Sequence, residues 1–159
     1  LPYYITSPVI MKLLEDRLPI TSITVMVQKE AAERLCAQPG TRECGAVSAA
    51  VQYYAEPKIL FEVSRGSFMP APNVDSAVIQ LRIRKEPPVD VHDEALFFRV
   101  IRAAFAQRRK TAVNSISNTL HMSKQQVTDA FEQAGVRANS RAEALTLPEF
   151  AAVVNQLAD

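Results

Sequence analysis

The stretch Ser76-Ala77-Val78-Ile79-Gln80-Leu81-Arg82-Ile83-Arg84-Lys85-Glu86-Pro87-Pro88 contains the point at which the chain changes character. Residues 76–84 predict a β-strand, with alternation through Val78, Leu81 and Ile83. Pro87-Pro88 ends this pattern, because proline fixes φ and removes a backbone donor. Helices and strands alternate before the prolines, whereas only helices are predicted after them. The sequence therefore predicts an α/β portion, residues 1–86, followed by a small all-α domain, residues 87–159.

The α/β portion is expected to be an incomplete sheet with its helices. Ser7 is expected to cap the first helix and Pro8 to occupy its first turn. Two or three strands cannot form a well-covered parallel sheet, so we expect the remaining strands to lie before Leu1. The predicted elements are helices at 8–17, 29–37 and about 45–54, strands at 20–28 and 58–63, and a structured loop at 64–75.

The residues after the prolines predict four helices. The longest runs from Asp93 to about Leu120, and its apolar side is formed by Leu96, Phe97, Val100, Ile101, Ala104 and Phe105. Ser123 with Gln126 is typical of a capping box, for a helix that ends at Gly135. The pairs Ser140 with Glu143 and Thr146 with Glu149 repeat this signature and predict two further helices.

Composition limits the classes of function. The 159 residues are 48% hydrophobic and 22% charged, with a net charge of +1, so only local charge clusters can indicate a polyanionic partner. No apolar run reaches the length of a membrane span, and Pro2 and Pro8 argue against a signal peptide. Cys36 and Cys44 do not form a zinc set, so we expect no metal, reduced thiols and a cytoplasmic protein.

Four short motifs follow one another along the chain. They are Leu1-Pro2-Tyr3-Tyr4, then residues 38–43 with Gln52-Tyr53-Tyr54, then residues 68–76 (FMPAPNVDS), and finally residues 105–111 (FAQRRKT). The first alone would favour a plain loop, because short motif matches are weak. In this order they resemble the bacterial small-subunit ribosomal RNA adenine dimethyltransferases. The resemblance covers nearly the whole chain.

The resemblance implies a fold, a cofactor and a set of catalytic residues. The α/β portion would be the C-terminal part of a Rossmann-like sheet that uses S-adenosylmethionine, and the chain lacks the glycine-rich turn of such cofactor sites. The Leu1 backbone carbonyl would accept a hydrogen bond from the adenine amino group, Pro2 would stiffen the turn, and Leu1 and Pro2 would border the cofactor. Tyr3 would stack on the flipped-out adenine, and Phe68 would add a second aromatic surface.

Structural alternatives accompany these assignments. Tyr3 taken alone could equally be a half-buried loop tyrosine, and Phe68 could be a loop anchor. Cys44 and Met69 depart from residues that the family often has, which affects local packing and not the reaction type. The family's motif has an Asn before the Leu that this sequence does not include. We therefore expect the chain alone to be inactive.

A basic cluster dominates the predicted long helix. No acidic residue occurs from 95 to 128, although a solvated helix face normally carries acidic residues among its basic ones. On one helix, Arg99, Arg102, Arg109 and Lys110 would share a sector of about 100°. Arg108 would follow the apolar stripe and pair with a carboxylate at the domain junction, or serve both roles. The candidate RNA-backbone contacts are Arg99, Arg102, Arg108, Arg109 and Lys110, extended by Arg82, Arg84 and Lys85 near the linker, with Arg42 as a weaker candidate on the substrate side.

Three functions remain open from the sequence. The leading hypothesis is S-adenosylmethionine-dependent dimethylation of the N6 amino groups of adjacent adenines in small-subunit rRNA, by a monomer that binds the small ribosomal subunit. The second is a non-catalytic module that binds RNA and the small subunit. The third is a methyltransferase of the macrolide-resistance type that acts on large-subunit rRNA.

Overall fold

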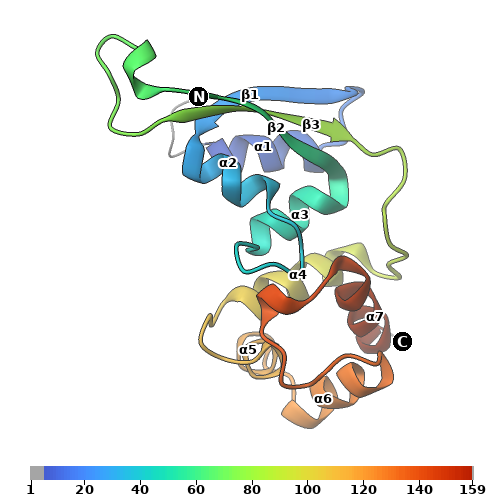
Figure 1. The fold of residues 1–159 in the computed structure, drawn as a ribbon. Coiled ribbons are helices and arrows are strands. Elements are labelled where there is room, and N and C mark those ends of the chain that lie inside the picture. Colours follow the sequence, from blue (N-terminus) through green and yellow to red (C-terminus); the bar gives the residue numbers. More distant parts are fainter. Residues whose placement is uncertain (1–5, 159) are drawn as a thin grey trace.

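The computed structural model describes residues 6–158, in which a sheet, a layer of helices and a helical bundle follow one another. In Figure 1, the helices α1, α2 and α3 lie on one side of the sheet, and α4 to α7 lie beyond α3. The first part consists of α1 (Thr6–Glu15), β1 (Ser22–Gln28), α2 (Lys29–Cys36), α3 (Ala46–Tyr54), β2 (Ala55–Val63), the 3-10 helix η2 (Arg65–Ser67) and β3 (Ser76–Ile83).

The three strands form one sheet in the order β1-β3-β2. The central strand β3 is antiparallel to both neighbours, so β1 and β2 run in the same direction. Ile79 of β3 is fully buried against the helices and lies opposite Val25 and Ile59. On the other face an exposed Met26 and an exposed Phe61 flank Val78 in register, and no described element covers this row.

The second part is entirely helical. It consists of α4 (Glu94–Phe105), α5 (Ala112–Leu120), α6 (Lys124–Gln133), the 3-10 helix η3 (Ala142–Ala144) and α7 (Leu147–Ala158). The Ser123 hydroxyl accepts a hydrogen bond from the Gln126 amide, which confirms the predicted cap of α6. The Thr146 amide donates to Glu149, while the Glu149 amide donates to the Thr146 hydroxyl, which confirms the capping box of α7.

The single long helix predicted from Asp93 to about Leu120 is wrong. The chain leaves the helix after Phe105 and re-enters one at Ala112, with a turn between them. The Thr111 hydroxyl accepts a hydrogen bond from the Asn114 amide and so starts α5. The apolar periodicity continues on both sides of the turn, because α4 and α5 contribute to the same hydrophobic core. The apolar periodicity of the sequence therefore gave no indication of the break between α4 and α5.

Three smaller predictions are corrected. Ser7 does not cap the first helix, because α1 already begins at Thr6 and Ser7 lies inside it. The predicted helix after Ser140 is only the 3-10 turn η3, whose preceding residue Arg141 makes no side-chain cap. The strand predicted at 58–63 begins earlier, at Ala55.

The two parts share aromatic packing. Tyr53 of α3 lies 5.2 Å, between ring centroids, from both Phe97 and Phe98 of α4, and Tyr54 stacks on Phe98. Tyr53 and Phe97 belong to one hydrophobic cluster that extends into the helical bundle. The division at residues 86 and 87 stays a prediction, and residues 46–54 pack against both parts. None of the described helices is long and apolar enough to cross a membrane.

Candidate functional site

The residues between α4 and α5, 106–111, form a tight turn that we call the basic turn. It presents Arg108, Arg109 and Lys110, all exposed. Beneath it, the buried Ser115 hydroxyl donates to the Ala103 carbonyl oxygen at 2.6 Å and accepts from the Gln107 amide at 3.0 Å. The hydroxyl thus gives the Gln107 amide a partner and adds a second hydrogen bond to the Ala103 carbonyl oxygen, which also accepts from the Ala106 amide. The turn is therefore held from inside the bundle.

The basic turn borders a cavity of about 290 Å³ that we call the cationic cavity. Arg42, from the segment between α2 and α3, and Arg141, from the segment before η3, line it together with the basic turn. Glu143 is the one carboxylate among its lining residues. The remaining lining residues are Cys44, Ala104, Phe105, Gln107 and Ala142.

Among the described residues, 6–158, the cationic cavity keeps an excess of positive charge. None of its five cationic side chains forms an ion pair within 4.0 Å in residues 6–158. Five positive charges around one carboxylate leave an excess of four (five minus one), which attracts anions and in particular phosphate oxygens. This arrangement is chemically suited to hold a phosphate group.

Cys44 forms part of the wall of this cavity without adding charge to it. Its side chain is buried, and burial raises the pKa of the thiol to about 11. The Cys44 thiol is therefore protonated at neutral pH, so it neither reduces the positive potential nor acts as a nucleophile. Cys36 and Cys44 are both free thiols.

The other predicted RNA contacts are distributed over different surfaces. Arg99 and Arg102 are exposed on α4, but Arg102 lines a separate apolar cavity near α1 and not the cationic cavity. The shared sector predicted for Arg99, Arg102, Arg109 and Lys110 is wrong, because the helix ends before Arg109.

Arg84 and Lys85 follow β3. The Arg84 Nε donates to the Gln52 carbonyl oxygen at 2.8 Å, and its Nη1 contacts Glu56 at 3.4 Å. Its guanidinium thus holds α3 and β2 together, whereas the neighbouring Lys85 is exposed.

The loop that carries Phe68 is ordered by polar contacts at its base. The Arg65 amide donates to the Asp75 carboxylate at 2.9 Å, and the Arg65 guanidinium donates to the Asn73 carbonyl oxygen. Phe68 is half-buried, and Met69 beside it is fully exposed. The predicted catalytic residues Leu1, Pro2 and Tyr3 lie outside the described residues.

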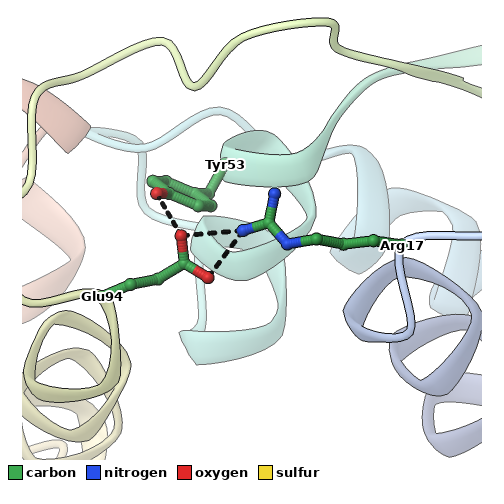
Figure 2. Close-up of polar contacts among 3 residues, drawn as sticks. All are labelled: Arg17, Tyr53 and Glu94. Carbon is green, nitrogen blue, oxygen red and sulfur yellow. Dashed lines mark hydrogen bonds and ion pairs between the residues drawn. The ribbon is translucent and has the colours of Figure 1, made fainter.

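A carboxylate does lie at the junction of the two parts, but its partner is not the predicted Arg108. Figure 2 shows Glu94, the first residue of α4, receiving hydrogen bonds from Arg17 and Tyr53. The Arg17 Nη2 lies 2.7 Å and 2.8 Å from the two carboxylate oxygens, and the Tyr53 hydroxyl donates at 2.8 Å. No local pattern indicates this contact, because 77 positions separate Arg17 from Glu94.

The contacts at Glu94 shift its ionisation. Burial acts to raise the Glu94 pKa, but hydrogen bonds from Arg17 and Tyr53 outweigh it, so the net pKa is lowered. Burial and the neighbouring Glu94 carboxylate raise the pKa of the Tyr53 hydroxyl. At neutral pH Glu94 is therefore charged and Tyr53 is a hydrogen-bond donor.

All of residues 1–159 match the model of the family described as ribosomal RNA adenine dimethylase. The chain belongs to this family. It is 50% identical over 157 residues to the ribosomal RNA small subunit methyltransferase A of Oceanobacillus iheyensis, covering 98% of this chain and 53% of that protein. It is 52% identical over 160 residues to the protein of the same name from Geobacillus sp. (strain WCH70), covering 99% and 55%.

Solved structures show the fold of this family member. A dimethyladenosine transferase from Plasmodium falciparum matches 99% of this chain with a TM-score of 0.81 at 23% identity, and a 23S rRNA methyltransferase, ErmE, matches all of it with a TM-score of 0.70 at 22% identity. The fold is thus the C-terminal part of a Rossmann-like methyltransferase sheet followed by a small all-α domain. The chain spans about half the length of the curated relatives and 64% and 63% of those two structures.

Proposed function

We propose that the chain is the RNA-facing half of an enzyme that dimethylates the N6 amino groups of adjacent adenines in small-subunit rRNA. Membership of the adenine dimethylase family and the names of the relatives that are about 50% identical support this reaction. The single structural observation that supports RNA as the substrate is the cationic cavity. The protein would act in the cytoplasm as a monomer on the small ribosomal subunit.

The proposed chemistry rests on positioning the adenine. The lone pair of an adenine amino group is delocalised into the ring, so an acceptor that binds its protons helps to aim it at the methyl group. The Leu1 carbonyl would be one such acceptor, Pro2 would fix the turn and Tyr3 would stack on the base. S-adenosylmethionine would supply the methyl group. No described residue is assigned to that cofactor, because Leu1 and Pro2 lie outside the described residues.

The proposed RNA contacts follow from the free cationic side chains. Arg108, Arg109 and Lys110 of the basic turn, with Arg42 and Arg141, would hold one or more backbone phosphates. Lys85 and Arg99, both exposed, would add weaker contacts at other positions along the RNA. Recognition of this kind depends on the shape and phosphates of a folded RNA, and not on base edges.

The reaction is tested with the full-length protein and purified small subunits that lack the methyl groups. Tyr3→Ala is expected to abolish methyl transfer while subunit affinity changes less than about threefold, because the stacking ring is removed and the phosphate contacts remain. Tyr3→Phe is the matched control and is expected to retain most of the activity. Full methylation by Tyr3→Ala would overturn the role of Tyr3.

A second candidate is an RNA-binding role that does not need catalysis. It is favoured by one observation, namely that the cationic side chains of the cavity lie on Arg42, Arg141 and the basic turn, away in sequence from the predicted catalytic motif at residues 1–4. Residues 1–159 alone are then expected to bind small subunits in a salt-dependent way, with binding abolished in Arg109→Glu. No binding at low salt would contradict this candidate. Mapping methylated adenines in rRNA from a deletion strain separates both candidates from a large-subunit enzyme.

A further inference from the structure

We propose that the cationic cavity binds one unpaired guanine nucleotide of the rRNA, with the Glu143 carboxylate accepting hydrogen bonds from the base and the basic side chains contacting its phosphate. This inference rests on the proposed function and deepens it, because it names a nucleotide that the RNA site would select. The observations that carry it are the size of the cavity, its neutral floor, and a carboxylate without an ion pair among five cationic side chains.

The volume of the cationic cavity exceeds what one phosphate group needs. At about 290 Å³ it has the space of roughly ten water molecules of about 30 Å³ each, and it is close to the lower limit of about 300 Å³ for small-molecule pockets. The cavity therefore has room for a purine base, with the attached phosphate at its open rim.

The lining of the cavity divides into a neutral floor and a charged rim. The floor is formed by the buried side chains of Cys44, Ala104 and Ala142, with the half-buried Phe105. The rim is formed by the exposed cationic side chains, namely Arg42, Arg108, Arg109, Lys110 and Arg141. A phosphate alone gains nothing from an apolar floor, whereas a nucleotide has an apolar ring face at one end and an anion at the other.

Glu143 is held in the cavity wall by the short helix η3. Its neighbours Ala142 and Leu145 are buried in the hydrophobic core of the bundle. Ahead of η3, the Ala112 amide at the start of α5 donates to the Ser140 carbonyl oxygen at 2.8 Å. The segment that carries the half-buried Glu143 is thus anchored on both sides, so its carboxylate is presented from a fixed backbone.

A carboxylate in this cavity is unfavourable for a site that binds phosphates alone, because its charge repels the phosphate oxygens that the cations attract. Glu143 forms no ion pair within 4.0 Å in residues 6–158, so it does not hold a cationic side chain in place. An ionised carboxylate only accepts hydrogen bonds, and it therefore suits a ligand that donates them.

Apart from the 2′-hydroxyl groups, the donors of an RNA lie on its bases. Guanine carries an imino proton at N1 and an amino group at N2 side by side on its Watson–Crick edge, and these parallel donors match the two oxygens of one carboxylate. Adenine, cytosine and uracil each place an acceptor beside their donor there. The edge is accessible only in a nucleotide that is not base-paired, such as one in a loop or bulge. The phosphate contacts of the rim remain independent of sequence, and Glu143 adds one base contact to them.

The first test is the sign of the change when the negative charge of Glu143 is removed. Glu143→Gln in the full-length protein makes the cavity more positive, so a site for phosphates alone would bind purified small subunits more tightly. The guanine contact predicts the opposite, namely about tenfold weaker binding, because the amide offers one acceptor where two are needed. Glu43→Gln, exposed next to Cys44 and outside the cavity lining, carries the same charge change and is expected to tighten binding by less than about threefold.

The second test identifies the base with free nucleotides. With S-adenosylmethionine present to occupy the cofactor site, the full-length protein is expected to bind guanosine 5′-monophosphate about fivefold more tightly than inosine 5′-monophosphate, which lacks the N2 amino group. Glu143→Gln is expected to remove this difference, while its affinity for inorganic phosphate is unchanged or higher. Retained phosphate binding also shows that the variant keeps the cavity folded.

The outcomes separate this inference from the proposed function. If the wild-type protein does not methylate small-subunit rRNA, the proposed function fails, and the nucleotide titrations still decide the guanine contact. If Glu143→Gln binds small subunits as tightly as the wild type or more tightly, the guanine contact is overturned and the cavity is a site for phosphates only. Equal affinities of the wild type for the two nucleotides would overturn it as well.

Discussion

The Ser115 hydroxyl of α5 donates a 2.6 Å hydrogen bond to the carbonyl oxygen of Ala103 in α4, across the turn that presents Arg108, Arg109 and Lys110. The same hydroxyl accepts from the Gln107 amide. One buried side chain thus links the end of one helix, the turn and the next helix. The turn is thereby fixed to the bundle by a hydroxyl that adds no charge to it.

Ser115→Ala is therefore expected to destabilise the chain by about 1–3 kcal/mol, because the Gln107 amide loses its partner and the Ala103 carbonyl oxygen loses one of its two hydrogen bonds. Urea unfolding followed by circular dichroism measures this change. Thr119→Ala, at an exposed position of the same helix, is the control and should change stability by less than about 0.5 kcal/mol. Equal effects of the two substitutions would contradict the role given to Ser115.

Arg141→Glu is expected to weaken binding to small subunits about tenfold or more, because it places a carboxylate in the cationic cavity. The slope of log affinity against log salt should also fall by about one for each phosphate that the variant no longer binds. Filter binding at several salt concentrations gives both values. Arg137→Glu, exposed four residues earlier and outside the cavity lining, carries the same charge change and should have a much smaller effect.

Phe97→Ala should cost about 3–5 kcal/mol of stability, because the fully buried ring is removed from the packing of α3 against α4. Protection of backbone amides from hydrogen exchange is expected to fall in both α3 and α4. Met69→Ala, at a fully exposed position, is the control. A fall in protection confined to α4 would show that α3 does not depend on this contact.

Glu94 predicts a pH dependence of stability with a defined sign. The Glu94 pKa is lowered below its ordinary value of 4.5 in the folded protein, so the charged form stabilises the fold above that pH. This contribution disappears as pH falls through the lowered value. Because Glu94 is 39% exposed, we expect about 1 kcal/mol or less. The melting temperatures of wild type and Glu94→Gln should differ at pH 7 and converge below pH 4.5, and divergence on acidification would contradict the assignment.

Local signals in the sequence were sufficient to predict most elements. The Ser123 cap, the Thr146–Glu149 box and the strand along residues 76–84 each depend on neighbouring residues, and each is present in the structure. The predicted alternation was wrong at Val78, which lies on the opposite face of the sheet from the buried Ile79 and Leu81. The α/β character before the prolines and the helices after them follow from such local periodicity. The ordered motifs also indicated the family, which the comparison with known families confirmed.

Fold class, family and the residue types that bear charge could thus be predicted from the amino-acid order alone, whereas the grouping of these charges depends on tertiary packing. The break between α4 and α5 depends on Ser115 reaching Ala103, and the cationic cavity depends on Arg42 and Arg141 arriving from distant segments. The contact of Arg17 with Glu94 likewise joins residues 77 positions apart. Such long-range contacts produce no periodic pattern in the amino-acid sequence, because their energy depends on packing and not on sequence neighbours.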